Sequence, residues 1–179
     1  VDPRIWLSIP EAQEIQPSGI IETVLTTARV RAIAVHRDGA ERLRGEGVTP
    51  GYFQRLGIRA ALGRPLEASD HEAGAGSVIV IGHRLWTRAY GANRSAIGSV
   101  LRTQRASYTI VGVAPPGFNG TVEDDDVEFW IPIEQYEPQR MITDRNSRQT
   151  WVLMLTRPGV SEAALRESIG AISRDWKAR

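Results

Sequence analysis

The sequence contains no cysteine, and only one of its 22 basic residues is a lysine, Lys177. Without cysteine the chain has no thiol nucleophile, no disulfide and no thiolate ligand for a metal. A Walker A phosphate loop needs a Gly-Lys pair before a helix, and a Schiff-base enzyme needs a lysine inside its fold, so both classes are excluded. Long apolar runs are missing too, since no stretch reaches the ~18 residues of a membrane span.

The composition predicts a folded domain that does not bind nucleic acid. The 179 residues are 41% hydrophobic and 24% charged, which is typical of globular proteins. The 22 basic residues are balanced by 21 acidic ones, so the net charge is only +1. Nucleic-acid-binding domains usually carry a clear basic excess. We therefore expect no nucleic-acid partner.

Residues that could perform chemistry are few and poorly arranged. The histidines His36, His71 and His83 have no spacing that suits a shared metal ion. The acidic run 123–126 lacks the pattern of a calcium loop. An enzyme would need Asp125 to meet a second carboxylate or a histidine in a cleft, and nothing marks such a partner. The chain is therefore predicted not to be an enzyme, with no catalytic, cofactor-binding or metal-ligating residue.

One glycine-rich run invites a phosphate-binding interpretation. Residues 45–51 read Gly-Glu-Gly-Val-Thr-Pro-Gly, but Pro50 stands where the third glycine of Gly-x-Gly-x-x-Gly should be. The preceding strand is also polar, unlike the buried strand that such a loop follows. The run is therefore predicted to be a structural turn at the end of an exposed hairpin arm.

Apolar spacing predicts a mixture of strands and short helices. Helices are expected over 10–14, 20–25, 50–57 and 83–90, and from Ser161 to the C-terminus. Strands are expected over 28–36, 41–48, 77–81, 100–102, 108–113, 127–133 and 151–156. Several strands follow each other as hairpins, and their connections are uneven in length. This order favours an α+β fold with mixed or antiparallel sheets over a doubly wound sheet.

The same order predicts two lobes. Residues 1–48 and 150–179 are expected to form one lobe from both chain ends, and 49–149 form a second, inserted lobe. The inserted segment carries its own strands, helix and aromatic residues, so it can build its own core.

Several segments together resemble a known family. Residues 48–57, Val-Thr-Pro-Gly-Tyr-Phe-Gln-Arg-Leu-Gly, are similar to the V-S-x-x-Y-F-x-x-x-G segment of MacB-like periplasmic core domains. The segments 77–86, 108–118 and 151–161 continue the resemblance in the same order. It extends from about residue 9 to residue 171 and looks most like the large FtsX-like permeases of acidobacterial type.

The resemblance implies an extracytoplasmic domain of an ABC-type permease in the inner membrane. It implies that the lobe of the chain ends is membrane-proximal and porter-like, and that the inserted lobe is distal and sabre-like. It also implies a non-catalytic role, in which the domain couples the motion of transmembrane helices to transport or to the handling of a partner or substrate. The implied partners are transmembrane helices of the same polypeptide, a cytoplasmic ABC ATPase, and a second permease copy or a periplasmic protein.

The sequence departs from the family pattern at two places, and one alternative stays open. The usual leading strand is reduced to residues 1–7, and the acidic loop 123–126 is not typical of the family. The alternative function is a binding module that captures a peptide or lipid between the lobes. Exposed side chains at Trp6, Leu66 or Phe118 would favour that alternative.

Overall fold

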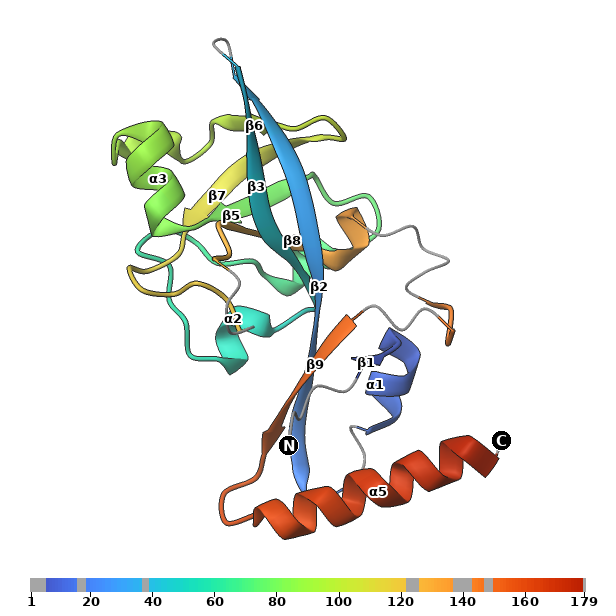
Figure 1. The fold of residues 1–179 in the computed structure, drawn as a ribbon. Coiled ribbons are helices and arrows are strands. Elements are labelled where there is room, and N and C mark those ends of the chain that lie inside the picture. The colour runs from blue at the N-terminus through green and yellow to red at the C-terminus, as the bar shows by residue number, and fades with distance from the viewer. Residues whose placement is uncertain are drawn as a thin grey trace. The chain divides into compact units, whose positions relative to one another are not determined.

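The computed structural model describes residues 6–15, 19–36, 39–121, 126–136, 143–146 and 150–178. It has an α+β fold with a mixed sheet and a few short helices, as predicted (Figure 1). The chain divides into two compact units. Unit 1 comprises Val1–Thr26 and Gln139–Arg179, and unit 2 comprises Thr27–Pro138.

The boundary between the units falls inside a strand. Strand β2 (Ile21–His36) contributes its first residues to unit 1 and the rest to unit 2. Residues 27–48, which the sequence analysis assigned to the lobe of the chain ends, lie in unit 2, because they pair with each other and then with a strand of that unit. The membrane-proximal and distal positions of the two lobes stay predictions.

The strands of unit 2 form a ring. Besides β2 they are β3 (Gly39–Val48), β4 (Leu62–Gly63), β5 (Val78–Ile81), β6 (Val100–Arg102), β7 (Ser107–Val113) and β8 (Phe129–Pro132). The hydrogen-bonded order is β2-β3-β8-β5-β7, with β4 and β6 also paired to β7. A bridge between Ala34 and Thr103, directly after β6, returns to β2 and closes the ring. The side-chain amide of Gln104 reinforces the closure, since its oxygen accepts from the Ile33 N–H at 2.5 Å.

The interior of the ring is the main core of unit 2. Alternate residues of each strand point inward and are buried, as the period of two predicts. The inward side chains of β2, β3 and β5 to β8 are Val30, Ala32, Ala34, Leu43, Ile79, Ile81, Leu101, Tyr108, Ile110, Val113, Phe129 and Ile131.

The glycine-rich run is strand from Gly45 to Val48, so the strand predicted over 41–48 is confirmed and the turn interpretation is wrong for these residues. These residues form the second half of β3, and their positions are buried rather than exposed. The glycine is required by packing: a Cβ on Gly45 would lie 2.3 Å from the Phe129 ring of the neighbouring strand. A side chain at position 45 is therefore excluded by contact with Phe129.

Short helices cover the ends of the strands. α2 spans Tyr52–Arg55, α3 spans His83–Tyr90, and the 3-10 turns η1, η2 and η3 span Ala68–His71, Arg94–Ala96 and Ile133–Gln135. α3 matches its predicted range and ends where Gly91 adopts a left-handed conformation with φ 57°. α2 is shorter than predicted, because its N-cap is Gly51 rather than Thr49 and no side chain caps it.

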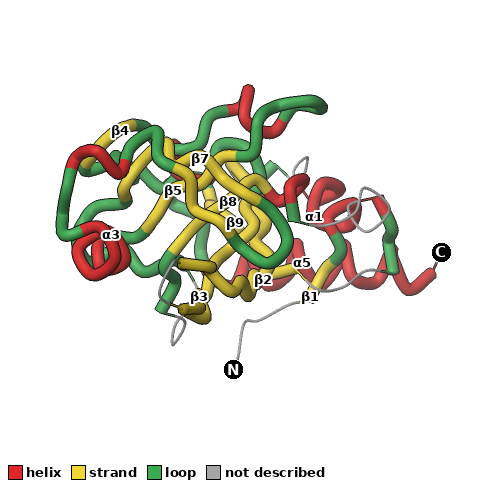
Figure 2. Tube along the Cα trace, turned by 90° about the horizontal axis from the view of Figure 1, so that it is seen from above, coloured by secondary structure: helices red, strands yellow, loops and turns green. Residues whose placement is uncertain are grey.

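Unit 1 combines a small sheet with two helices. Its elements are β1 (Trp6–Leu7), α1 (Ile9–Ile15), the start of β2, β9 (Thr150–Thr156) and α5 (Glu162–Ala178). β1 pairs antiparallel with β9, which lies next to β2 (Figure 2). Leu7, Ile15 and Ile21 form its buried cluster. None of the helices among the described residues combines the length and the apolar character needed to cross a bilayer.

Local sequence explains the helix starts of unit 1. Ser8 and Glu11 form a capping box at α1: the Ser8 N–H donates to the Glu11 carboxylate at 2.9 Å, and the Glu11 N–H donates to the Ser8 hydroxyl at 3.3 Å. At α5 the predicted N-cap is confirmed, since Ser161 Oγ accepts from the Ala164 N–H at 3.2 Å.

The predicted helix over 20–25 is wrong, because the segment is the start of β2. Its residues Ile21, Thr23 and Leu25 are buried and Glu22 is exposed, which is the alternation of a strand. Apolar residues at 20, 21, 24 and 25 fit a helix face equally well over so short a stretch. Pairing within the sheet decides the outcome in favour of the strand, and the β-branched side chains are compatible with it.

Candidate functional site

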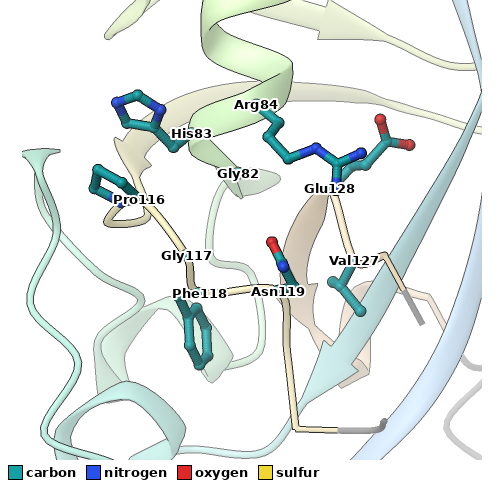
Figure 3. Close-up of a pocket in the computed structure, with 9 residues that line it drawn as sticks. All are labelled: Gly82, His83, Arg84, Pro116, Gly117, Phe118, Asn119, Val127 and Glu128. Carbon is teal, nitrogen blue, oxygen red and sulfur yellow. The ribbon is translucent and has the colours of Figure 1, made fainter. Parts of the chain in front are cut away.

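A small pocket lies in unit 2 at the start of α3. It has a volume of about 150 Å³. Its walls come from Gly82 and the first residues of α3, from 116–119, and from Val127 and Glu128. In Figure 3, Arg84 extends toward Glu128, on the side of the pocket away from His83 and Pro116. Ligand sites for small molecules usually measure ~300–1,000 Å³, so this pocket has room only for water molecules or a small group.

The charged residues of α3 are engaged in ion pairs. Arg84 donates to Asp126 at 2.7 Å. Arg88 donates to both Glu41 at 2.6 Å and Glu128 at 2.7 Å, which raises the pKa of its guanidinium. Asp126 is the one member of the predicted acidic loop within the described residues; the positions 123–125, and with them Asp125, lie outside. The ion pair between Asp126 and Arg84 thus ties the segment before β8 to α3.

A buried carboxylate stands at the end of β3. Glu46 is 2% exposed and accepts hydrogen bonds from the Tyr52 hydroxyl and the Trp130 indole N–H, both at 2.9 Å. The Thr121 hydroxyl lies 3.2 Å from the same Tyr52 oxygen. Because Tyr52 begins α2 and Trp130 belongs to β8, one carboxylate ties together a helix and two strands. A buried charge is stable only when it is hydrogen-bonded in this way.

Aromatic rings surround this carboxylate. Trp130 stacks on Phe118 with ring centroids 5.0 Å apart, and Phe53 meets Trp130 edge-on at 5.8 Å. Burial, together with the charge of Glu46, raises the pKa of the Tyr52 hydroxyl above its ordinary range. The hydroxyl therefore stays protonated and donates to Glu46 at all physiological pH values.

A second polar cluster fixes the loop before β5. Arg64 donates two hydrogen bonds to Asp70, at 2.6 and 2.8 Å, and the Glu67 N–H donates to the same carboxylate at 2.8 Å. The Arg64 guanidinium lowers the pKa of Asp70. Nearby, His71 Nδ1 lies 2.8 Å from a Glu134 oxygen. These contacts fix the position of η1, and the hydrogen bonds from Arg64 and Glu67 compensate for the burial of the Asp70 carboxylate.

The two histidines whose side chains the structure describes have separate neighbours. His71 pairs with Glu134, His83 packs edge-on against Trp86 at 5.4 Å, and the side chain of His36 lies outside the described residues. Where side chains are described, no three acidic or histidine groups are placed to hold a metal ion.

The alternative function, a binding module, would be favoured by exposed side chains at Trp6, Leu66 or Phe118. Leu66 is 3% exposed and therefore does not favour that alternative; its carbonyl accepts from Gln54 and its side chain packs inward. Phe118 is half-buried in the aromatic cluster rather than free. The side chain of Trp6 lies outside the described residues. The capture of a peptide or lipid between the lobes stays a prediction, since the pocket belongs to unit 2.

Sequence reasoning missed the Glu46 network. A glutamate between two glycines in a polar strand gave the impression of an exposed arm. A signal was present, because Tyr52 and Trp130 are aromatic residues with a donor that needs a partner when buried. The partner could not be identified, since Trp130 is 84 residues from Glu46.

Comparison with known proteins agrees with the pattern of motifs. The profile of the family described as MacB-like periplasmic core domain matches residues 2–172. The chain belongs to the MacB-like periplasmic core domain family. It is therefore an extracytoplasmic domain, of a kind found in transporter permeases rather than in a catalytic family.

Two curated relatives share part of this domain. A probable export ATP-binding/permease protein of Pseudomonas fluorescens (strain Pf0-1) is 32% identical over 88 residues. The probable syringafactin export ATP-binding/permease protein SyfD of Pseudomonas syringae pv. syringae (strain B728a) is 30% identical over 88 residues. In both cases the match covers 49% of this chain and 13% of the relative. The chain thus matches a small part of each of these proteins.

Solved structures of periplasmic regions share the fold of the MacB-like domain. The periplasmic region of MacB from Actinobacillus actinomycetemcomitans superimposes with a TM-score of 0.74 at 17% identity, covering 97% of this chain and 75% of that one. The extracellular domain of the noncanonic ABC-type transporter YknZ from Gram-positive bacteria gives 0.68 at 13% identity, covering 94% and 80%. Both similarities concern the fold.

Proposed function

We propose that this MacB-like domain is a non-catalytic part of an ABC-type export permease. It couples the motion of transmembrane helices in the same polypeptide, driven by a cytoplasmic ABC ATPase, to events outside the membrane. The family membership supports the assignment of this domain to a transporter permease. A mechanical role is favoured by one feature of the fold, the continuity of β2.

Strand β2 belongs to both units. Its 16 residues contain neither glycine nor proline, and the unit boundary falls between Thr26 and Thr27, which are 3% and 2% exposed. From Thr27 to His36 every residue is in register with β3. A paired strand without a flexible residue resists bending and stretching, so displacement of one end is transmitted to the other.

The polar residues also suit a structural role. Asp70, Asp126 and Glu134 each have a cationic or histidine partner on a neighbouring element, and Glu46 is held by two donors. A catalytic carboxylate must instead face a space that admits a substrate. The arrangement of these groups supports position-holding rather than chemistry.

The coupling is tested by interrupting β2 in the full-length permease. Two glycines are inserted between Thr26 and Thr27, and a fluorophore is attached to an Arg59→Cys variant in unit 2. The introduced cysteine is the only thiol of the domain, because the chain itself contains no cysteine. We expect an ATP-dependent change of the fluorophore signal in the uninterrupted protein, and its loss after the insertion while ATP hydrolysis persists.

The matched control places the same two glycines after Gly74. This glycine lies in an exposed loop of unit 2, and no atom lies within 4 Å of the position that a Cβ would take there. In this control protein the ATP-dependent change of the fluorophore signal should persist. An interruption of β2 that leaves the signal intact in a folded domain would contradict the proposal.

A further inference from the structure

The outer surface of the β2–β3 hairpin differs from the rest of unit 2. Side chains at the odd positions from Arg31 to Val35 of β2 and at Arg42 and Arg44 of β3 point away from the core. β6 continues this surface. Thr103, directly after β6, pairs with the inward-facing Ala34. The residues before Thr103 alternate in direction, so Arg102 and Val100 point outward. The exposed members, here called the hairpin face, are Arg31, Ile33, Val35, Arg42, Arg44, Val100 and Arg102.

The hairpin face carries unneutralised positive charge. Its four arginines are exposed, and among the described residues none of their guanidinium groups forms an ion pair, in contrast to Arg84 and Arg88 of α3. Arg31 lies directly opposite Arg44 in the register of β2 and β3. Like charges in such a cross-strand pair destabilise a sheet. The folding of unit 2 therefore gains nothing from this arrangement.

The same face displays the apolar side chains that the fold leaves uncovered. Within the described part of the chain, the large hydrophobic residues classed as exposed are Ile33 (38%), Val35 (50%) and Val100 (53%). All three lie on the hairpin face. Single exposed apolar residues are common, but their gathering on one face beside unpaired arginines is typical of an interaction surface.

The spacing on the strands indicates the chemistry of the partner. Along β2 the outward residues run Arg31, Ile33, Val35, and Ile33 is in register with Arg42. The arginines thus gather at the Arg31–Arg44 end of the face, and Ile33 and Val35 follow in steps of two residues. An extended polypeptide presents every second residue to such a surface, so acidic residues at two successive positions of one face, followed by aliphatic residues at the next two, are complementary to this order.

A lipid surface fits less well than a protein. Proteins that lie in a membrane interface insert aromatic or long apolar side chains there. The hairpin face offers β-branched residues on a rigid strand pair and has no aromatic side chain. We propose that the hairpin face docks an acidic, extended segment of a second protein, whose carboxylates meet Arg42 and Arg44 and whose aliphatic side chains cover Ile33 and Val35.

The test measures binding of a defined peptide to the 179-residue chain. The probe is a ten-residue peptide that carries two glutamates and then two valines at every second position, with serine between them and a rhodamine label. Its binding is measured by fluorescence anisotropy at low and moderate salt. The comparison peptide has lysine in place of glutamate. We expect at least tenfold tighter binding of the acidic peptide, with an advantage that shrinks as salt is raised.

Two double variants separate a specific face from general charge. Arg42→Glu with Arg44→Glu should weaken binding of the acidic peptide at least tenfold. Arg59→Glu with Arg94→Glu makes the same change in net charge at exposed arginines elsewhere in unit 2 and should cost less than threefold. Val35→Ser should weaken binding about threefold, because it removes an apolar contact and no charge.

The first double variant is expected to stay folded, so its weaker binding reports on the hairpin face. Glutamate at position 44 faces Arg31 and replaces a repulsive pair by an attractive one, so the melting temperature of the first double variant should not fall. Equal losses in the two double variants, or equal affinity for the two peptides, would overturn the proposal. So would vesicles containing phosphatidylglycerol that displace the peptide through the same arginines, since that outcome assigns the face to a membrane.

Discussion

Unit 1 and unit 2 are stabilised in different ways. Unit 2 closes a ring of strands around a core of thirteen buried side chains, and a second aromatic cluster packs around Glu46. The buried cluster described in unit 1 has three members, and its ion pairs, such as Arg145 with Glu14, lie at the surface. Buried apolar area is the dominant favourable term in folding, whereas exposed ion pairs contribute little. The comparison predicts that substitutions in unit 2 cost far more than substitutions in unit 1.

The largest effect is expected from Trp130→Ala in unit 2. Trp130 is fully buried, stacks on Phe118 and donates to Glu46, so its removal leaves a large cavity and takes one donor from a buried carboxylate. Loss of a buried tryptophan costs about 3–5 kcal/mol of unfolding free energy. Urea unfolding followed by circular dichroism measures this loss. Trp86→Ala, at a half-buried position on α3, serves as the control and should cost clearly less.

Gly45→Ala should have the next largest effect. The new methyl group would lie within 2.5 Å of three atoms of the Phe129 ring, which is itself buried and cannot move away. Overpacking of this kind costs about 1–3 kcal/mol. The melting temperature of Gly76→Ala, where no atom lies within 4 Å, should stay the same or rise slightly. A similar melting temperature for both variants would show that unit 2 is packed more loosely than its contacts indicate.

Asp70→Asn is expected to have a smaller effect that depends on pH. Hydrogen bonds from Arg64 lower the pKa of Asp70 in the folded state, so its carboxylate stabilises the fold above its unfolded pKa of about 4. At pH 7 the variant should lose about 1.5 kcal/mol, the low end of the range for a hydrogen bond to a charged group, because the Arg64 side chain is 37% exposed. As the pH falls below about 4, protonation removes the advantage of the wild type, and the two unfolding free energies should converge.

A control identifies this pH dependence with Asp70. Glu72→Gln, two residues along at an exposed position, should leave the unfolding free energy nearly unchanged at both pH values. A gap between wild type and Asp70→Asn that stays constant from pH 7 to pH 3 would show that the ion pair with Arg64 does not carry the effect.

The smallest effect is expected in unit 1. Glu162 and Arg166 pair at i, i+4 on α5 at 2.6 Å, with 75% and 60% of their side chains exposed. Such exposed helix pairs contribute about 0.3–0.5 kcal/mol. Arg166→Ala should therefore lower the melting temperature by about a degree or two, and more than Glu167→Ala, which removes an exposed charge from the same helix. A loss as large as that of Gly45→Ala would show that unit 1 depends on its surface charges.

Local patterns in the sequence predicted most elements of the fold. α3 could be assigned because its apolar spacing and the following glycine agree, and α5 because Ser161 marks its start. The start of β2 was predicted as a helix, since over six residues the two periods cannot be told apart and only pairing with other strands decides. Short-range signals therefore suffice where an element has its own start and stop.

The remaining features depend on partners distant in the chain. Gly45 could not be recognised as a packing glycine, because its neighbour Phe129 is brought to it only by the parallel pairing of β3 and β8. The hairpin face was also hidden, since only the register of β2 and β3 shows that Arg31 and Arg44 lie opposite each other. The family membership was more accessible, because it depends on the order of several short segments rather than on any one contact.

The bridge between Ala34 and Thr103 has a consequence for the behaviour of the domain at high concentration. An open sheet ends in strands whose free amide and carbonyl groups recruit strands from other molecules. In unit 2 one bridge and the side chain of Gln104 occupy that margin of β2. This small closure leaves less free backbone on β2 for pairing between molecules, although β2 displays an arginine-rich surface.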